Sequence, residues 1–373
     1  MNKLKKVGLT ALAGTLVSMS AAQAGAVSVG GTAELSWTKL AEHKVTGQQL
    51  GQKKNISFSG SGEFANGWTF GVFHAMTDAM DGLSSSSMNL NMGGIATLAY
   101  DSGTGGYGAN AVDNVVPIAW EEIDYGFATG ITDVGAVSKA KGVVNFTVTA
   151  PGSGTSLSLS WASRMGAGHV HDGGTSGDVT GTGHSGIDAR LDLWNVNTSW
   201  FDIRTGVAAE KVWHPVNCQM EHLKTYTNTC QQKADAYAGT IYQTLGIGPL
   251  SAGFQATYKD PGTGGGIENN QSFVGGFAIT IGSALSFSCG KGEDLYYYSD
   301  ELAWVTQQQQ GINHDGGRGQ DKLRTSFRGC SAAGNWGPLA LKYVLNSVDN
   351  QGGTHRTSDG SEKHSEINLS MAF

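Results

Sequence analysis

Within one long polar segment, residues 101–140, the acidic residues of interest are Asp113, Glu121, Glu122 and Asp124. Carboxylates that line a narrow aqueous passage raise the local concentration of cations, and the bulk of such a segment limits solute size. On an external loop the same acids would be solvated and would have no particular role. The residues alone leave both interpretations open.

Three basic residues stand in segments whose apolar and polar residues alternate: Arg190, Arg204 and Lys342. Each directly adjoins an apolar residue, so a period of two puts all three on the polar face of a strand. Bases on the polar face, opposite the acids of residues 101–140, would create a transverse field that orders water and disfavours apolar solutes. We interpret them as candidate lumen bases.

Three histidines, His169, His171 and His184, share a glycine-rich stretch with Asp172. Neutral imidazoles with a carboxylate could bind a transition metal, but a polar external loop is the interpretation we favour. We therefore predict no cofactor. A structural Ca²⁺ at a subunit contact is compatible with acidic loops, although no dedicated calcium-loop spacing is present.

Two enzyme signatures bear on whether the chain could be catalytic. The stretch Gly103-Thr104-Gly105-Gly106-Tyr107-Gly108 matches the dinucleotide pattern G-x-G-x-x-G, but that site needs a helix opening inside a parallel βαβ unit. Residues 109–117 show no sustained apolar helical face. The chain also lacks a G-x-S-x-G nucleophile elbow, so we predict that it is not an enzyme.

The elements that must position these residues are strands. The last seven residues alternate, with Ile367, Leu369, Met371 and Phe373 on one face. The pattern recurs along the chain, and seven tight turns, such as Ala65-Asn66-Gly67, join its segments in pairs. Seven turns join fourteen strands, and the two terminal strands bring the predicted number of strands to sixteen. Long polar loops alternate with the turns, at about residues 39–54, 76–87, 101–140, 164–186, 214–234, 259–271, 290–322 and 346–364.

Short turns on one rim and long loops on the other are typical of outer-membrane β-barrels. A soluble all-β protein, with its apolar faces packed inside, is the competing interpretation. Residues 1–24 have the basic start, apolar stretch and small-residue end of a signal peptide. Its loss removes Lys3, Lys5 and Lys6 and changes the formal charge from −7 to −10, which argues against a nucleic-acid partner.

The four cysteines fall into two pairs. Cys218 and Cys230 bracket a polar stretch and are a disulfide candidate in an oxidising compartment. Cys289 lies in one strand candidate and Cys330 in another, on either side of a long loop. Alternation puts Cys289 on the apolar face but leaves the face of Cys330 open, so we expect a bridge between them only if a bulge shifts one of the two.

The chain resembles the sixteen-stranded general porins of Gram-negative bacteria, particularly the alphaproteobacterial type. The likeness is carried by the signal-like residues 1–24, the hairpin Ser61 to Val72, the long third loop with Ala111 to Pro117 and Glu121-Glu122, and terminal Phe373. The resemblance implies a homotrimer of water-filled channels in which the third loop folds inward and narrows each pore. A clear arginine cluster opposite that loop is missing, which leaves the selectivity open.

We therefore predict an all-β fold in which residues 25–373 form a sixteen-stranded antiparallel transmembrane β-barrel with short periplasmic turns and long external loops. The expected function is passive diffusion of small hydrophilic solutes and ions across the bacterial outer membrane, with a weak preference for cations. Its partners would be outer-membrane lipids and two further copies of the chain. A substrate-specific channel and a plugged structural or adhesive barrel are the alternatives.

Overall fold

The structure is a computed structural model of the chain. It describes residues 25, 27–40, 49–76, 83–102, 106–112, 114–127, 134, 137–138, 141–163, 185–198, 200–213, 235–262, 267–282, 284–298, 322–349 and 361–373. The signal-like residues 1–24 lie outside these ranges, and the prediction of a signal peptide is therefore not tested.

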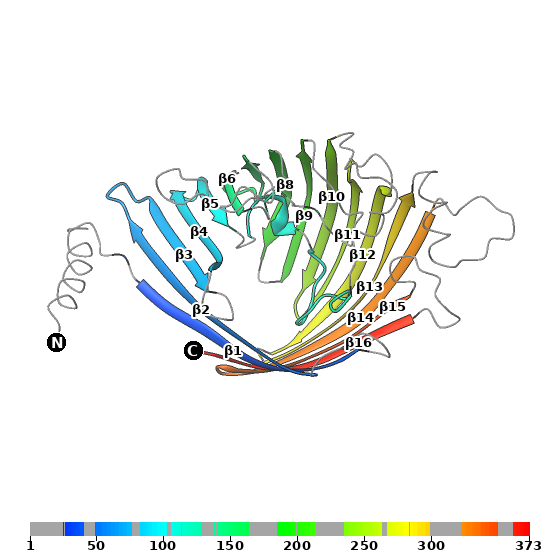
Figure 1. The fold of residues 1–373 in the computed structure, drawn as a ribbon. Coiled ribbons are helices and arrows are strands. Elements are labelled where there is room, and N and C mark those ends of the chain that lie inside the picture. The colour runs from blue at the N-terminus through cyan, green and yellow to red at the C-terminus, as the bar shows by residue number, and fades with distance from the viewer. Residues whose placement is uncertain are drawn as a thin grey trace, which may run out of the picture.

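Sixteen antiparallel strands form a single closed barrel in the part of the chain that the structure describes (Figure 1). Each strand pairs with its neighbours in sequence, as the alternation of short and long connections predicts. The predicted fold class is confirmed. The strands are β1 (Val27–Leu40), β2 (Leu50–Glu63), β3 (Thr69–Met76), β4 (Leu83–Met92), β5 (Ala96–Ser102), β6 (Lys141–Thr149), β7 (Ser156–Ala162), β8 (Gly186–Asn197), β9 (Phe201–Val212), β10 (Ala236–Ile247), β11 (Leu250–Asp260), β12 (Ile267–Ile281), β13 (Leu285–Tyr298), β14 (Lys322–Trp336), β15 (Leu339–Asp349) and β16 (Ser361–Ala372).

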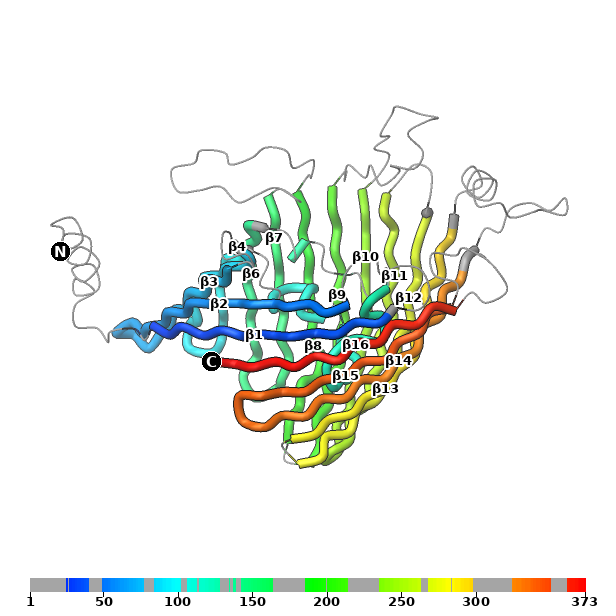
Figure 2. The backbone as a smooth tube through the Cα atoms, turned by 60° about the horizontal axis from the view of Figure 1, so that its bottom comes forward, coloured from blue at the N-terminus to red at the C-terminus, as the bar shows by residue number. Residues whose placement is uncertain are grey.

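The barrel closes where the first and last strands run side by side (Figure 2). The register of this pair sets Trp37 opposite Ile367. The pairing reaches the C-terminal residue: the Gly31 amide donates to the Phe373 carbonyl at 2.9 Å, and the Phe373 amide donates to the Gly31 carbonyl at 3.0 Å. Closure removes both sheet edges, which is a requirement for strands that cross lipid.

The two faces of the barrel have the inverse of a soluble protein's polarity. On β15, the outward side chains Leu341 and Leu345 are each 46% exposed, whereas inward Asn346 is 1% exposed. Elsewhere most outward positions toward the short turns are likewise apolar, and inward Asn145 and Gln255 are almost fully buried. Apolar-out, polar-in alternation fits a barrel surrounded by lipid, and it excludes the soluble all-β interpretation.

Several predicted loops are longer than the observed ones, because strands extend into residues 50–54, 83–87, 267–271 and 290–298. The loop expected at residues 290–322 begins later, because β13 continues to Tyr298 and pairs with β14 as far as Tyr297 opposite Lys322. At the last hairpin β14 continues through Trp336, so the turn lies at Gly337 and Pro338. In β13 the outward face changes from apolar to charged part-way along, so hydrophobicity alone ends the strand too early.

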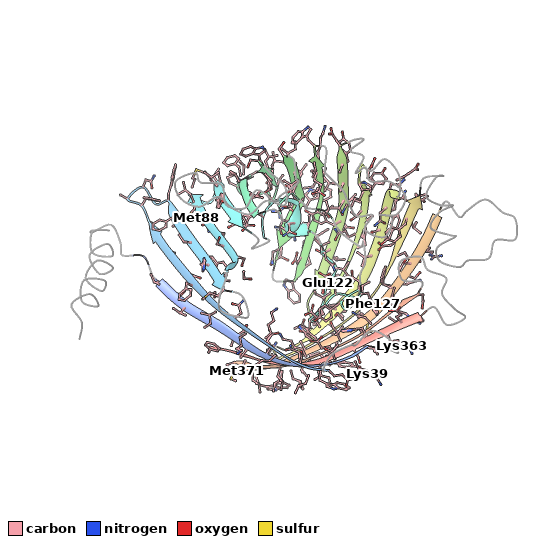
Figure 3. The ribbon with its side chains drawn as sticks, viewed as in Figure 1. Lys39, Met88, Glu122, Phe127, Lys363 and Met371 are labelled. Atoms are coloured by element: carbon pink, nitrogen blue, oxygen red, sulfur yellow. A yellow bond between two sulfur atoms is a disulfide. The ribbon has the colours of Figure 1, made fainter. Side chains whose placement is uncertain are left out.

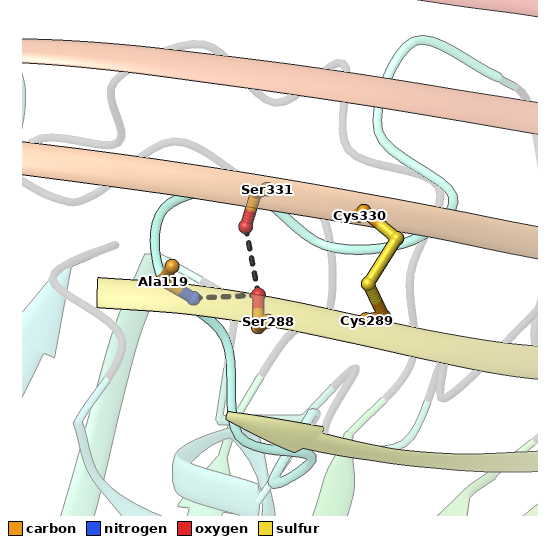
Figure 4. The surroundings of a disulfide bond; sticks show 5 residues. All are labelled: Ala119, Ser288, Cys289, Cys330 and Ser331. Atoms are coloured by element: carbon orange, nitrogen blue, oxygen red, sulfur yellow. Dashed lines mark hydrogen bonds between the residues drawn. A yellow bond between two sulfur atoms is a disulfide. The ribbon is translucent and has the colours of Figure 1, made fainter. Parts of the chain in front are cut away.

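Cys289 and Cys330 form a disulfide, with their Cα atoms 4.1 Å apart (Figure 4). The two residues are direct cross-strand partners in an uninterrupted β13–β14 register. The expectation that a bulge would be needed is therefore wrong, because Cys330 shares the outward face of Cys289. Cys218 and Cys230 lie outside the described residues, and their pairing stays a prediction.

Helix is limited, in the described part of the chain, to the short 3-10 turn η1 (Gly108–Val112). No helix among these residues is long and apolar enough to cross a membrane.

A lipid-facing charge tests the outward assignment. Phe277 lies on the outer face of β12 and is 55% exposed. We expect Phe277→Lys to lower the free energy of unfolding by about 2–4 kcal/mol if the site lies near the bilayer midplane. Thr280→Lys, at an exposed inward position of the same strand, is the control and should cost much less. Urea unfolding of the barrel in lipid vesicles measures both, and equal losses would contradict the assignment.

Candidate pore constriction

The third long loop lies inside the barrel, against its inner wall. Its backbone meets one strand after another in chain order. The Ala109 amide donates to Asp188 of β8 at 3.2 Å, and the Val115 amide donates to Gln255 of β11 at 3.1 Å. Gln255 also donates to the carbonyl of Val112 at 2.8 Å. Because Asp188 and Gln255 face inward, these bonds hold the first part of the loop within the ring of strands.

The second part of the loop continues along β13 to β16. The Ala119 amide donates to Ser288 of β13 at 2.8 Å, and Ser288 and Ser331 share a hydrogen bond of 2.8 Å (Figure 4). The Asn346 amide group of β15 then donates to the Glu122 carbonyl at 2.8 Å and to the Tyr125 carbonyl at 3.1 Å. Figure 3 shows Glu122 inside the ring of strands. Inward polar side chains of the wall therefore fix the course of the loop.

A row of glycines makes room for the loop. Directly paired inward positions on four adjacent strands lack a side chain. A Cβ added to Gly253 would lie 2.9 Å from Pro117 Cδ, and a Cβ added to Gly276 would lie 2.7 Å from Val116 Cγ1. Ile123 of the loop packs over the other two glycines. A Cβ added to Gly290 would lie 2.9 Å from Ile123 Cγ2, and a Cβ added to Gly329 would lie 3.1 Å from Ile123 Cα. The row consists of Gly253, Gly276, Gly290 and Gly329, and it continues into Asn346.

The end of the described loop packs on β16. His364 is 3% exposed, and the ring centroids of Tyr125 and Phe127 lie 5.3 Å and 6.3 Å from its own. Gly126 between them has a φ of 90°, and an added Cβ there would collide with His364. The Tyr125 hydroxyl donates to Glu366 at 3.2 Å. Burial, followed by the Glu366 charge, raises the pKa of Tyr125, so its hydroxyl stays protonated and remains a donor.

Glu121 belongs to a mixed group of charges. Burial raises the pKa of Glu121, and the Glu366 carboxylate raises it further, whereas two lysines act in the opposite direction. One of them, Lys342, lies with its Nζ 5.7 Å from the centre of the Trp120 ring. The group comprises the acids Glu34, Glu121 and Glu366 and the bases Lys53 and Lys342. With three acids to two bases, it is acidic when all of its members are ionised.

Two of the predicted bases meet one aspartate. Arg190 Nε lies 3.2 Å from Asp192, and Arg204 Nε lies 3.4 Å from its other carboxylate oxygen. The Tyr242 hydroxyl donates to the same aspartate at 2.5 Å. Arg190 also donates to the Gly108 carbonyl of the loop at 3.3 Å. Asp192 therefore partly neutralises both arginines, and the group of two arginines and one aspartate keeps a formal charge of +1.

The structure brings some predicted site residues together and leaves others undescribed. Glu121, Glu122 and Asp124 lie on the inward-folded loop, and Arg190, Arg204 and Lys342 lie on the wall that it crosses. Asp113 lies outside the described residues, as do His169, His171 and His184. Among the residues that are described, no group of three acids, histidines or cysteines could hold a metal ion. The roles of these residues in selectivity stay predictions.

Sequence reasoning missed the residues that hold the loop. Asp188, Gln255, Ser288 and Asn346 are ordinary polar residues at inward positions, and alternation alone would have placed them on that face. Nothing in one sequence says which inward residue meets the loop, because that depends on the register between strands. The glycines of these strands do provide a signal for the position of the loop, because glycine inside a strand often marks a place where another part of the backbone approaches closely.

Comparison with known proteins identifies the architecture. No protein-family model matches the chain, and no curated protein sequence matches it. Solved structures do. The outer-membrane protein OmpT of Vibrio cholerae has a TM-score of 0.59 at 10% identity, over 95% of this chain and 99% of its own. OprB of Pseudomonas putida has 0.59 at 10%, over 97% of each chain. The anion-selective porin of Comamonas acidovorans has 0.56 at 12%, over 94% and 100%.

The chain folds as a porin-like outer-membrane barrel. At these identities the likeness establishes the fold alone. Together with the apolar outer surface and polar interior, the fold locates the protein in the bacterial outer membrane. The likeness does not distinguish an alphaproteobacterial type from other porin-like barrels.

The glycine row provides a test of how the loop is held. In Gly253→Ala the new methyl would lie 2.9 Å from Pro117, so we expect the loop to move off the wall and to become more sensitive to added protease. Gly275→Ala is the control: it points outward on the adjacent strand, and its Cβ would have an ordinary 3.7 Å contact. Both variants should keep the heat-modifiable mobility of a folded barrel. Equal protease sensitivity of the two would show that the row does not seat the loop.

The shifted pKa of Glu121 gives a pH dependence. Because the pKa of this acid is raised, it binds a proton at a higher pH than an exposed glutamate does. On acidification from neutral pH, any cation preference of the barrel should therefore begin to fall before the exposed carboxylates titrate. Reversal potentials measured along a pH series should show this early step in the wild type and lack it in Glu121→Gln. An unchanged early step in the variant would rule Glu121 out as its source.

Proposed function

We propose that the protein is a channel for passive diffusion of small hydrophilic solutes and ions across the outer membrane, with a weak preference for cations. The observation that carries the proposal is the course of the third loop, which is fixed across the inner wall of a closed barrel from β8 to β16. Such a loop narrows the lumen and brings its own charges into it. No bond chemistry is needed, and the proposal is a channel, not an enzyme.

The preference for cations rests on the loop residues. Glu121, Glu122 and Asp124 are partly exposed on the loop, and the two lysines near Glu121 face three carboxylates. Carboxylates at a constriction raise the local cation concentration. The fold by itself does not set the sign, since the structurally similar Comamonas porin is described as anion-selective.

We also propose that three copies assemble. One solved form of the Vibrio OmpT is described as a trimer and has a TM-score of 0.58 to this chain at 10% identity.

A substrate-specific channel is the second candidate function, supported by the Trp120 ring of the inward loop, which lies beside Lys342 of β15. It would show saturable uptake and block by one solute, whereas general diffusion would show neither.

Single-channel recording of the folded protein in a planar bilayer under a salt gradient tests the proposal. We expect discrete conductance steps, grouped in threes if the trimer is intact, and a reversal potential of the sign for cations. Glu121→Gln combined with Glu122→Gln should move that potential toward zero because it removes charge from the lumen. Asp349→Asn, at an exposed outward position of β15, should leave it unchanged. A barrel that inserts but gives no steps would overturn the channel.

A further inference from the structure

The outer face of β13–β16 and β1 changes character at one cross-strand row. In the two rows nearer the short turns, the outward positions carry apolar residues or glycine. The first is Phe287, Ala332, Tyr343, Ile367 and Trp37, and the second is Leu285, Gly334, Leu341, Leu369 and Leu35. The next row toward the long loops is Cys289, Cys330, Leu345, Ser365 and Lys39, and above it the outward face becomes charged.

The row after the disulfide carries three cations. Lys291 pairs directly with Arg328, Arg328 with Ser347, and Ser347 with Lys363. The side chain of Lys291 is 69% exposed, and Arg328 and Lys363 are exposed. Two like charges directly opposite each other across a strand pair are destabilising unless an anion lies between them. Arg328 donates to the Ser347 hydroxyl at 3.0 Å, which supplies no charge.

The neighbouring acids do not balance this surface. Glu293 forms a salt bridge with Arg324 and lies 3.9 Å from Lys291 Nζ. Asp349 lies one row further on β15. The surface, which we call the outer cation face, comprises Lys39, Lys291, Arg324, Arg328 and Lys363, and with its two acids it has a formal charge of +3. The whole chain carries −7, so the cations are concentrated here against the overall balance.

Lys363, on the β16 part of the outer cation face, lies close to the expected edge of the lipid. Lys363 precedes Phe373 by ten positions, and at about 3.3 Å per residue and a tilt near 45° it lies about 23 Å above the short-turn rim, close to the top of an apolar band about 25 Å tall. Figure 3 shows Lys39 and Lys363 toward one end of the β1–β16 pair and Met371 toward the other. Long basic side chains at this level extend toward the headgroups.

We propose that the outer cation face binds the phosphate groups of a lipid in the leaflet next to the long loops. The acyl chains would lie on the apolar rows below, and a phosphate between Lys291 and Arg328 would relieve their repulsion. A soluble anion would gain nothing from the apolar rows, which is why we infer a lipid. The inference depends on the membrane location of the barrel and is independent of whether the barrel conducts.

Native mass spectrometry of the folded protein released from detergent micelles tests the proposal, with bis-phosphorylated lipid A, phosphatidylcholine and inorganic phosphate as separate probes. We expect retention of lipid A over phosphatidylcholine, and no displacement of lipid A by inorganic phosphate. Lys291→Gln with Arg328→Gln should weaken lipid A retention about twenty-fivefold, since each basic residue near an anionic surface contributes about fivefold. Added salt should weaken wild-type retention as well.

Lys211→Gln is the matched control. Lys211 also faces outward, on β9, but it has a close carboxylate partner of its own, Asp235 at 2.7 Å, whereas Lys291 lies 3.9 Å from Glu293, which Arg324 shares. The loss of Lys211 should therefore leave lipid A retention unchanged. Equal retention in the wild type and the double variant would overturn the proposal. So would displacement by inorganic phosphate, or a double variant that changes the number of associated copies while it keeps the lipid. The planar-bilayer recording would be unaffected by any of these outcomes.

Discussion

Backbone hydrogen bonding in lipid is the constraint on which the rest of this structure depends. A strand that crosses a membrane cannot leave its N–H and C=O groups unpaired, so the sheet must close. The β1–β16 register provides the closure as far as Phe373. Once closed, each strand has one face toward lipid and one toward the lumen. The inversion of polarity, with Leu341 outside and Asn346 inside, follows from that division.

Two features of the inner wall hold the loop inside the barrel: its polar side chains and its glycines, which have no side chain. Gln255, Ser288 and Asn346 provide hydrogen bonds to the backbone of the loop, while the glycine row provides the space. Buried backbone groups away from secondary structure need such partners. The loop is therefore part of the folded wall, and its course is set by side chains on strands far away in sequence.

Much of the fold could be predicted from the sequence because lipid-facing strands alternate strictly. The strand number and the alternation of short turns with long loops follow from that pattern. The end of β13 could not be predicted in this way, because Lys291 and Glu293 interrupt the apolar face while the strand continues to Tyr298. The partner of Cys289 was also out of reach, because a pairing depends on register and one sequence does not specify it. For the same reason Asn346 could be placed on the inner face but not under the loop.

Four consecutive residues of β13 show how tightly the two faces are linked. Ser288 holds the loop inside, Cys289 forms the disulfide outside, Gly290 gives the loop room, and Lys291 begins the outer cation face. A slip of one residue would exchange every one of these positions between lumen and lipid. The disulfide joins β13 to β14 within this stretch, next to the Ser288–Ser331 pair. A covalent bond on the lipid side therefore fixes the register on which the lumen side depends.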